Sequence, residues 1–325
     1  MRRVAFSGDT ERGGIAVMVA LLMVVLLGFA AISIDVARLY SERGQLQNGA
    51  DSVALMLGQK CAKNLNDVDC SDTLASPVVL ARTLANANAV DGQSNVKAIV
   101  LDKANRKATV TTSAKASGGA LNSVPDLFAR ALGFSNSEVT ATSNVQWGTP
   151  SKGTVIVPLA IAECKFSPDP SFVQVLNMNA GGCSGIPGGF GWITDPNGAD
   201  SACSVVISAG ASNNPGIWFS SDTGASRPSV CSPGDISALN DQTVLLPLYA
   251  VATGTGSGGK YYIKGFAAFH VTGYRFSSDT WNSSGLANKS LRGYFVKFVS
   301  LSQALELGST ADYGASVVRL TIGVP

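Results

Sequence analysis

The side chains best suited to chemistry in this sequence are six cysteines and a single histidine, His270. A metal site is disfavoured, because the sequence has no CxxC pair and one histidine supplies few ligands. An even number of cysteines in an exported segment is typical of disulfides, whose pairing stays open at this stage. The shortest separation predicts one local pair, Cys61–Cys70. The six residues are Cys61, Cys70, Cys164, Cys183, Cys203 and Cys231.

Two further patterns resemble catalytic sites but have simpler interpretations. Residues 254–261 read GTGSGGKY, with Tyr261 where a phosphate-binding loop needs Ser or Thr. The residues that follow alternate as in a strand, which predicts a hairpin loop here. His270 lies in the same alternating run, and no GxSxG motif occurs, so we predict a structural histidine. We therefore expect no enzyme activity, no cofactor and no bound nucleotide.

The most conspicuous element is the uncharged apolar run from Gly13 to Ile34, which has 22 residues. As a helix it would extend roughly 33 Å, enough to cross the hydrocarbon core of a bilayer. A secretory signal has a shorter apolar region followed by small residues at a cleavage site. The run therefore predicts a retained anchor in a lipid bilayer.

Apolar residues continue beyond this run at spacings of three and four, and Arg43 is the one polar interruption. No proline occurs before residue 77, so one long helix is predicted, embedded at its start and amphipathic afterwards. The alternative is a simple signal anchor followed by an ordinary surface helix. The predicted packing seam consists of Val36, Leu39, Leu46, Ala50, Val53 and Leu57.

The charges that flank the apolar run predict its orientation. Arg2, Arg3 and Arg12 precede it, whereas Arg38 and Arg43 follow it. Because lysine and arginine are enriched on the cytoplasmic side, the N-terminus is predicted to lie in the cytoplasm. The cysteine-containing remainder would then be extracytoplasmic, and the protein would be a single-pass protein of the cytoplasmic (inner) membrane.

Composition agrees with an exported, β-rich body. The net charge is +2, 14% of residues are charged, and 35 of the 325 residues are glycine. Nucleic-acid binding is disfavoured, since no basic stripe is present. The predicted fold class is α+β. Its predicted divisions are a cytoplasmic N-terminus at 1–12, a transmembrane helix at 13–34, an amphipathic helix at 35–63, a small α+β unit at 64–148 and a β-rich domain with disulfides at 153–325.

Four elements are predicted within the small α+β unit. Residues 77–89 are expected to form a helix, and residues 97–102 and 106–114 a hairpin. Residues 125–134 are expected to form a short helix with Ser123 as its N-cap. Residues 138–146 alternate as a strand. The sequence GTPSKG at 148–153 is predicted to be the loop that ends this unit.

The second half begins with TVIVPLAIA at 154–162, and a related run, TVLLPLYAV, recurs at 243–251. The two could be matching strands of one sheet, although coincidence between apolar strands is an equal alternative; a proline in each favours bulges or edges. Further strands are predicted at 261–273, 291–300 and 316–324. The insert at 164–231 is predicted to be held by two disulfides and to bind a partner through exposed loops at 188–192 and 213–219.

The N-terminal fifty residues resemble the Tad domain of TadE/TadG-like proteins of the tight-adherence (Flp) pilus assembly systems. The resemblance rests on an RG-x-x-AV start, an apolar span with an aspartate near its far end, and a QLQNxAD run. The resemblance implies a bacterial single-pass membrane protein with a large outer domain that is needed for pilus biogenesis. The motif positions are Arg12, Gly13, Ala16, Val17, Asp35, Gln45, Leu46, Gln47, Asn48, Ala50, Asp51, Ala54 and Leu55.

Two departures refine the resemblance. Prepilins carry a glutamate a few residues into the apolar run, and Met18 occupies that position here. The chain therefore resembles the TadG side of the family more than a cleaved, polymerised subunit. Some TadG-type proteins contain a von Willebrand factor A domain with a DxSxS metal site; residues 200–204 and 235–239 come nearest to that pattern and do not fit it.

The sequence thus predicts a membrane-anchored, non-enzymatic component of Flp-type pilus assembly or surface attachment, with cell adhesion as the biological setting. Its expected partners are the bilayer and other pilus-assembly proteins or pilin subunits. One alternative is a surface-anchored hydrolase or carbohydrate-binding module, which would need clustered acidic residues in a concave site. A second alternative is a pilin-like structural subunit, which Met18 disfavours.

Overall fold

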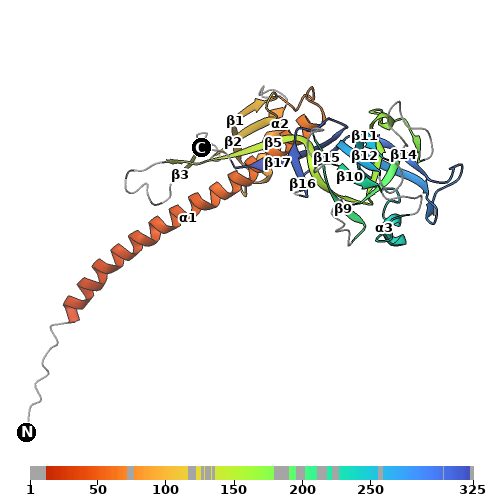
Figure 1. The fold of residues 1–325 in the computed structure, drawn as a ribbon. Coiled ribbons are helices and arrows are strands. Elements are labelled where there is room, and N and C mark those ends of the chain that lie inside the picture. Colours follow the sequence, from red (N-terminus) through yellow and green to blue (C-terminus); the bar gives the residue numbers. More distant parts are fainter. Residues whose placement is uncertain are drawn as a thin grey trace, which may run out of the picture.

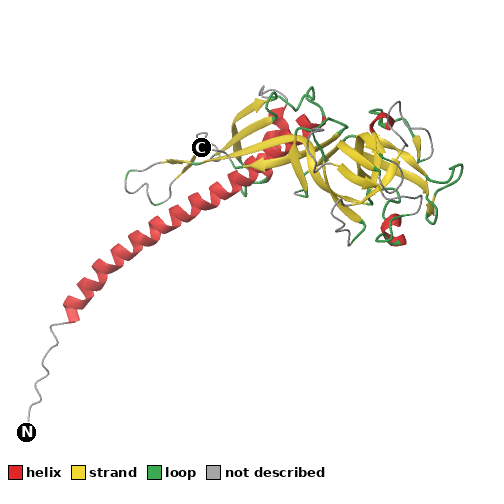
Figure 2. Ribbon diagram, in the orientation of Figure 1, coloured by secondary structure: helices red, strands yellow, loops and turns green. Residues whose placement is uncertain are grey.

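A computed structural model shows a long helix that projects from an elongated body made almost entirely of strands (Figures 1 and 2). Helix α1 runs without interruption from Arg12 to Lys63, as the absence of proline predicts. The structure describes residues 12–71, 77–115, 122–125, 128, 133, 136–178, 190–194, 202–210, 218–221, 227–254, 259–302 and 304–322.

The body contains two large sheets and one small one. The first large sheet has the order β1-β2-β5-β17-β15, and β9 and β16 also pair with β5. These strands are β1 (Ser94–Asp102), β2 (Lys107–Ala114), β5 (Thr140–Ile156), β9 (Ser204–Ser208), β15 (Phe298–Ser300), β16 (Leu305–Gly308) and β17 (Ala315–Thr321). The small sheet is the antiparallel pair of β3 (Ser123–Pro125) and β4 (Asn136–Glu138).

The second large sheet has the order β10-β8-β6-β11-β12-β14-β7, and β13 pairs with β12. Because β10 also pairs with β12, the strands β6, β8, β10, β11 and β12 close into a ring. The strands are β6 (Leu159–Ala162), β7 (Gln174–Asn177), β8 (Phe190–Thr194), β10 (Trp218–Ser221), β11 (Thr243–Thr253), β12 (Lys260–Arg275), β13 (Thr280–Trp281) and β14 (Ser290–Val296).

Short helical elements α2, α3 and η2 also occur among the described residues. Helix α2 (Pro77–Ala87) packs on α1 and β1, close to the helix predicted at 77–89. Helix α3 (Pro233–Ser237) begins at an N-cap, Ser232, whose side chain accepts a hydrogen bond from the backbone of Asp235. The 3-10 turn η2 (Glu163–Lys165) follows β6 directly.

Strand β5 is the spine of the first sheet, and it corrects the prediction of a loop at 148–153. These residues are strand, and β16 pairs with them from Thr149 to Gly153. A side chain at Gly148 would lie 2.6 Å from the carbonyl oxygen of Gly308, so glycine permits the close approach of β16. Glycine and proline suggested a turn at 148–153. Instead, Gly148 lies at a close contact with β16, and the pairing register with β16 shifts between Pro150 and Lys152. The proposed division of the chain at this point stays a prediction.

The C-terminal strand β17 returns to this N-terminal sheet and pairs with β5 from Asn144 to Gly148. The predicted small α+β unit is therefore not built from residues 64–148 alone. The hairpin of β1 and β2 agrees with prediction, since Asp102 pairs with Lys107. The fold class, a long apolar helix followed by a β-rich body with disulfides, is confirmed.

Two predicted strands in the second half are each divided between the two large sheets. The run at 154–162 breaks at Val157, a valine with a φ of 61°, and the chain passes there from β5 to β6. The run at 291–300 breaks at Lys297, between β14 and β15. The two proline-bearing runs do meet in one sheet, because β6 and β11 are parallel neighbours, with Leu248 opposite Ile161.

The short helix predicted at 125–134 is wrong where it can be tested. Ser123 is not an N-cap but lies in β3, Pro125 ends that strand, and Phe128 lies in a bend. A strand of three residues is too short to be recognised from alternation, whereas Ser shortly before Pro is a common helix start. The other residues of the predicted helix, apart from Gly133 in a turn, lie outside the described residues.

Candidate functional site: the docked half of helix α1 and the stapled insert

The C-terminal half of α1 lies against the first sheet and against α2 (Figure 1). Four residues of the predicted seam, Leu46, Ala50, Val53 and Leu57, are fully buried. Leu39 is partly buried beside Leu46, whereas Val36 is 45% exposed and does not share this packing. The packed part of the seam therefore begins one to two turns after the apolar run ends.

Two glycines set the distance between α1 and its neighbours. A Cβ atom at Gly58 would lie 2.6 Å from Val318 Cγ1 and 2.8 Å from Val145 Cγ2. A Cβ atom at Gly49 would lie 3.4 Å from Ala85 Cα, on α2. Small residues allow elements to approach closely, so Gly58 seats the helix on β5 and β17.

The QLQNxAD run forms the polar border of this packed face. Gln45 Oε1 accepts a hydrogen bond from the backbone N–H of Val90, at 2.7 Å. Gln47 Nε2 donates to Asp51 Oδ1 at 2.9 Å, and also to the carbonyl of Thr142 on β5. Asn48 is exposed, and its carbonyl accepts from Ser52.

Hydrogen bonds also hold the helix backbone and the end of α1. The Thr112 hydroxyl of β2 donates to the carbonyl of Leu46 at 2.8 Å. At the C-terminus of α1, Cys61 and Cys70 form the local disulfide that the sequence predicts. Lys60 Nζ lies 2.6 Å from Asp69 in the same loop, so the chain that leaves the helix is fixed by two links.

The N-terminal half of α1 is exposed instead of packed on the body. Its large apolar side chains from Ile15 to Ile34 are exposed, and no residue of its most apolar 18-residue stretch is buried. Among the described residues, this is the one helix long and apolar enough to cross a membrane. Arg12 and Gly13 begin the helix, and their side chains lie outside the description.

The insert at 164–231 contains a disulfide, and the described residues of its two predicted loops lie in strands. Cys203 and Cys231 form a disulfide, and Cys164 is also disulfide-bonded. Cys183 lies outside the described residues. Of the two predicted loops, residues 190–192 lie in β8 with Trp192 fully buried, and residues 218–219 lie in β10 with Phe219 buried. Aromatic residues and glycines suggested surface loops, but Trp192 and Phe219 are buried inside the ring of strands. Residues 188–189 and 213–217 lie outside the described residues.

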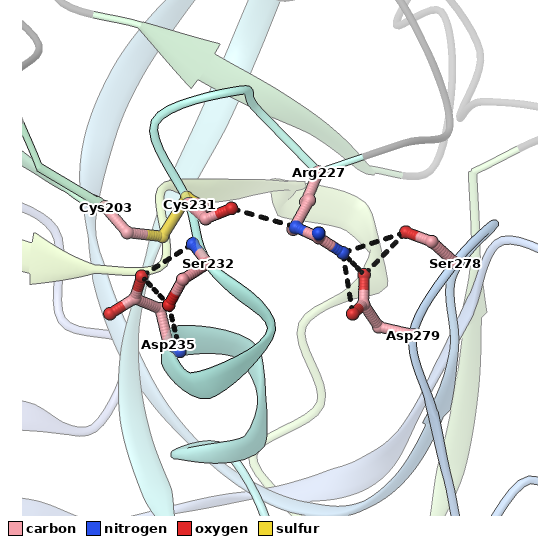
Figure 3. A network of polar contacts seen from close by, with 7 residues as sticks. All are labelled: Cys203, Arg227, Cys231, Ser232, Asp235, Ser278 and Asp279. Carbon is pink, nitrogen blue, oxygen red and sulfur yellow. Dashed lines mark hydrogen bonds and ion pairs between the residues drawn. A yellow bond between two sulfur atoms is a disulfide. The ribbon is translucent and has the colours of Figure 1, made fainter.

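Arg227 ties the stapled insert to the turn before β13 (Figure 3). Its Nη1 lies 2.7 and 2.5 Å from the two carboxylate oxygens of Asp279, which is largely buried. Its Nε donates to the carbonyl of Cys231 at 2.8 Å, directly at the disulfide. Ser232 and Asp235 then form a reciprocal capping box at the start of α3 (Figure 3). A charged pair of this kind fixes the loop geometry.

Glu163 makes a second polar link, between η2 and two distant parts of the chain. Its Oε1 accepts hydrogen bonds from Lys264 Nζ at 2.8 Å and from the Tyr313 hydroxyl at 2.5 Å. Burial raises the pKa of Glu163, but these two hydrogen bonds and the charge of Lys264 outweigh it, so the pKa falls below its ordinary value. Burial and the nearby carboxylate of Glu163 raise the pKa of Tyr313.

The two patterns that resembled catalytic sites take structural positions. Strands β11 and β12 are antiparallel, with Thr253 opposite Lys260, and Tyr261 lies in β12 and not in a helix. Residues 255–258 between them lie outside the described residues. His270 lies in β12. Its Nδ1 is 3.2 Å from Thr243 Oγ1, and its Nε2 is 3.2 Å from Asp241 Oδ1. Within the described residues, no group of three or more His, Cys, Asp or Glu side chains could hold a metal ion.

These features define a class: a single-pass membrane-anchor candidate in which the spanning helix is also the first core helix of a β-rich body. Residues 13–57, which lie within α1, match the family model described as "Putative Flp pilus-assembly TadE/G-like". The match ends at Leu57, the last residue of the buried seam. No curated protein and no solved structure matches the chain.

Proposed function

We propose that this protein is a membrane-anchored, non-enzymatic component of Flp/Tad-type pilus assembly that acts through protein–protein contacts of its body. The N-terminus would lie in the cytoplasm, the anchor in the cytoplasmic membrane, and the body outside it. The observation that carries the proposal is the TadE/G-like match at residues 13–57, which covers both the candidate span and the docked seam of one helix.

The geometry supports a role in positioning. Helix α1 has 52 residues and no proline, so it extends about 78 Å as one rod. The seam and the disulfide at Cys61 fix one end of this rod to the body. The body is thereby held at a defined place relative to the membrane, which suits a component that presents a surface to pilin subunits or other assembly proteins.

The surface best suited to such a contact lies on β7, the neighbour of β14, and Figure 1 shows β14 in the part of the body remote from α1. Strand β7 ends its sheet and, within the described residues, pairs with β14 alone. Three large apolar side chains at or beside it are more than half exposed: Phe172, Val173 and Val175. Clustered exposed apolar residues on an edge strand are typical of interaction surfaces. We call these three residues the β7 patch.

The test is a charged substitution in the β7 patch, Val175→Lys, in the full-length protein expressed in its native host. The expected result is loss of surface pili and adherence, with normal protein level and membrane location. The matched control is Val206→Lys on β9, because Val206 is about equally exposed, at 50% against 52% for Val175. Normal piliation with Val175→Lys, or equal defects with both variants, would count against the β7 patch as the contact surface.

Deletion of the whole insert at 164–231 would be a poor test of the same idea. The insert contributes β7, β8, β9 and β10, and it buries Trp192, Ile193 and Phe219 in the core. Removing it would take β8 away from β6 and β10 away from β12, open the ring and expose the core. Loss of piliation after that deletion would report unfolding and not loss of a contact.

A further inference from the structure

The starting point is Asp35, the first charged residue after the apolar run that ends at Ile34. Asp35 is 6% exposed, although its neighbours Ile34 and Val36 are 51% and 45% exposed. A buried carboxylate is costly unless hydrogen-bond donors satisfy it. Something in the body must therefore reach the helix at the point where it leaves the span.

The group that reaches Asp35 comes from the connection between β3 and β4. The backbone N–H of Phe128 donates to Asp35 Oδ2 at 2.9 Å, across 93 residues of sequence. Strands β3 and β4 are antiparallel, with Pro125 opposite Asn136, so Phe128 lies beyond their paired end. We call Ser123–Pro125, Phe128 and Asn136–Glu138 the β3–β4 arm. Figure 1 shows β3 extending away from the first sheet on the side from which α1 projects.

The base of this arm is fixed to the first sheet. Asn122 accepts hydrogen bonds from Ser113 Oγ at 2.6 Å and from Asn95 Nδ2 at 3.2 Å. Lys97 Nζ on β1 lies 2.6 Å from Glu138 Oε1 on β4. With its base held by β1 and β2 and its far end held by Asp35, the arm has a defined direction along α1.

The depth of Phe128 follows from the position of Asp35. A helix rises about 1.5 Å per residue, so Asp35 lies within a few Å of the end of the apolar run. The bond to Asp35 places Phe128 at this level, and its side chain is 45% exposed. Aromatic residues at this level of membrane proteins sit among the lipid headgroups, with their rings toward the acyl chains.

We infer that the β3–β4 arm is a second membrane contact, in which Phe128 enters the headgroup region of the leaflet from which α1 emerges and the Asp35–Phe128 bond locks the arm to the helix. The occupant of this surface is the lipid bilayer, since the surface is continuous with the apolar face of the span. The inference rests on the anchor assumed in the proposed function.

The consequence is a fixed orientation of the body. One helix alone leaves rotation and tilt to be set by whatever else contacts the interface. A second contact on one side of the helix removes that freedom and holds the β7 patch, at the far part of the body, in one direction relative to the membrane plane. This adds the orientation that the rod of α1 cannot supply by itself.

The experiment measures the depth of a tryptophan in the full-length protein reconstituted into phosphatidylcholine vesicles. Phe128→Trp is compared with vesicles that carry bromine near the headgroup or deep in the acyl chain. Emission added by the substitution is expected to be quenched strongly by shallow bromine and weakly by deep bromine. The matched negative control is Val68→Trp, because Val68 is 65% exposed and follows the opposite end of α1. It should not be quenched.

One further variant keeps the outcomes distinguishable. Leu27→Trp, in the middle of the apolar run, should be quenched by deep bromine if α1 spans the bilayer. Quenching of Leu27→Trp without quenching of Phe128→Trp would overturn the arm and leave the anchored function standing. Absence of quenching in both would overturn the anchor, and with it both proposals.

The lock is tested in the Phe128→Trp background. Asp35→Asn keeps a side-chain oxygen that can accept the bond, so shallow quenching should persist. Asp35→Ala removes the acceptor, and shallow quenching should fall while the thermal unfolding of the body is unchanged. Full shallow quenching with Asp35→Ala would show that the arm reaches the membrane without this bond and would overturn the lock. Leu27→Trp combined with Asp35→Ala reports any sliding of the helix.

Discussion

At the scale of single residues, the polar side chains of this protein join segments that are distant in sequence. Glu163 receives hydrogen bonds from Lys264 and from Tyr313, which are 101 and 150 residues further along the chain. Arg227 likewise joins the disulfide at Cys231 to Asp279. Such links add little net stability each, but they specify which segments meet.

The lowered pKa of Glu163 predicts a pH dependence of stability. A carboxyl group whose pKa is lower in the folded state stabilises that state above its unfolded pKa, and this contribution is lost as pH falls through the folded pKa. Glu163→Gln should therefore reduce the free energy of unfolding at pH 7, by less than about 1 kcal/mol because Lys264 is partly exposed and screened.

The measurement is urea denaturation of both proteins at several pH values. The difference between wild type and Glu163→Gln should shrink as the pH falls below 4.5, the ordinary pKa of the group. A difference that is constant from pH 7 to pH 3 would mean that the carboxylate charge does not carry the effect.

At the scale of elements, the docking of α1 on its sheet depends on Gly58. A side chain there would meet Val318 and Val145, which belong to β17 and β5. Gly58→Val should therefore push the helix off the sheet and lower the free energy of unfolding by about 1–3 kcal/mol, the usual cost of overpacking.

The control for this prediction is Gly44→Ala on the same helix, since nothing lies within 4 Å of a Cβ atom at Gly44. That change should leave stability equal or raise it by up to about 1 kcal/mol, because alanine favours the helix. Chemical denaturation followed by circular dichroism measures both. Equal stability of Gly58→Val and wild type would show that the close contact at Gly58 does not exist in solution.

At the scale of the whole molecule, the first described helix, α1, packs on the sheet that contains the last described strand, β17. Helix α1 packs on β5 and on β17, and Val317 and Val318 of β17 are fully buried. The strands β9, β15 and β16 also come from beyond residue 148. The seam of α1 is therefore covered in part by residues more than 250 positions away.

This arrangement predicts how fragments behave. A fragment of residues 35–148, which joins the predicted amphipathic helix at 35–63 to the predicted α+β unit at 64–148, should not fold cooperatively, because it lacks β17 and leaves one edge of β5 unpaired. A fragment of residues 35–325 should fold, because the exposed residues before Ile34 add nothing to the core. Thermal unfolding measured by circular dichroism distinguishes them. A sharp transition in the shorter fragment would show that the first sheet is independent of its C-terminal strand.

The sequence by itself determined the features that depend on neighbouring residues. An uncharged run followed by residues at helical spacing, without proline, is enough to specify α1 from the span to Lys63. Close cysteines were enough for the disulfide of Cys61 and Cys70, and the apolar span together with the QLQNxAD run was enough for the family resemblance. Alternation specified the hairpin of β1 and β2. Each of these signals lies within one continuous stretch of the sequence.

Only the tertiary structure decided which strands meet. Strand β17 returns to β5, and Phe128 contacts Asp35, although the local sequence at each position gives no sign of its partner. The chain also passes from one sheet to the other at Val157, which the local sequence does not indicate. The GTPSKG sequence has the composition of a turn, yet it is strand because β16 approaches it closely from beyond residue 300. Pairing between distant strands is a property of the whole chain. A strand's hydrogen-bond partners, and the positions where only glycine fits, depend on the neighbouring strand.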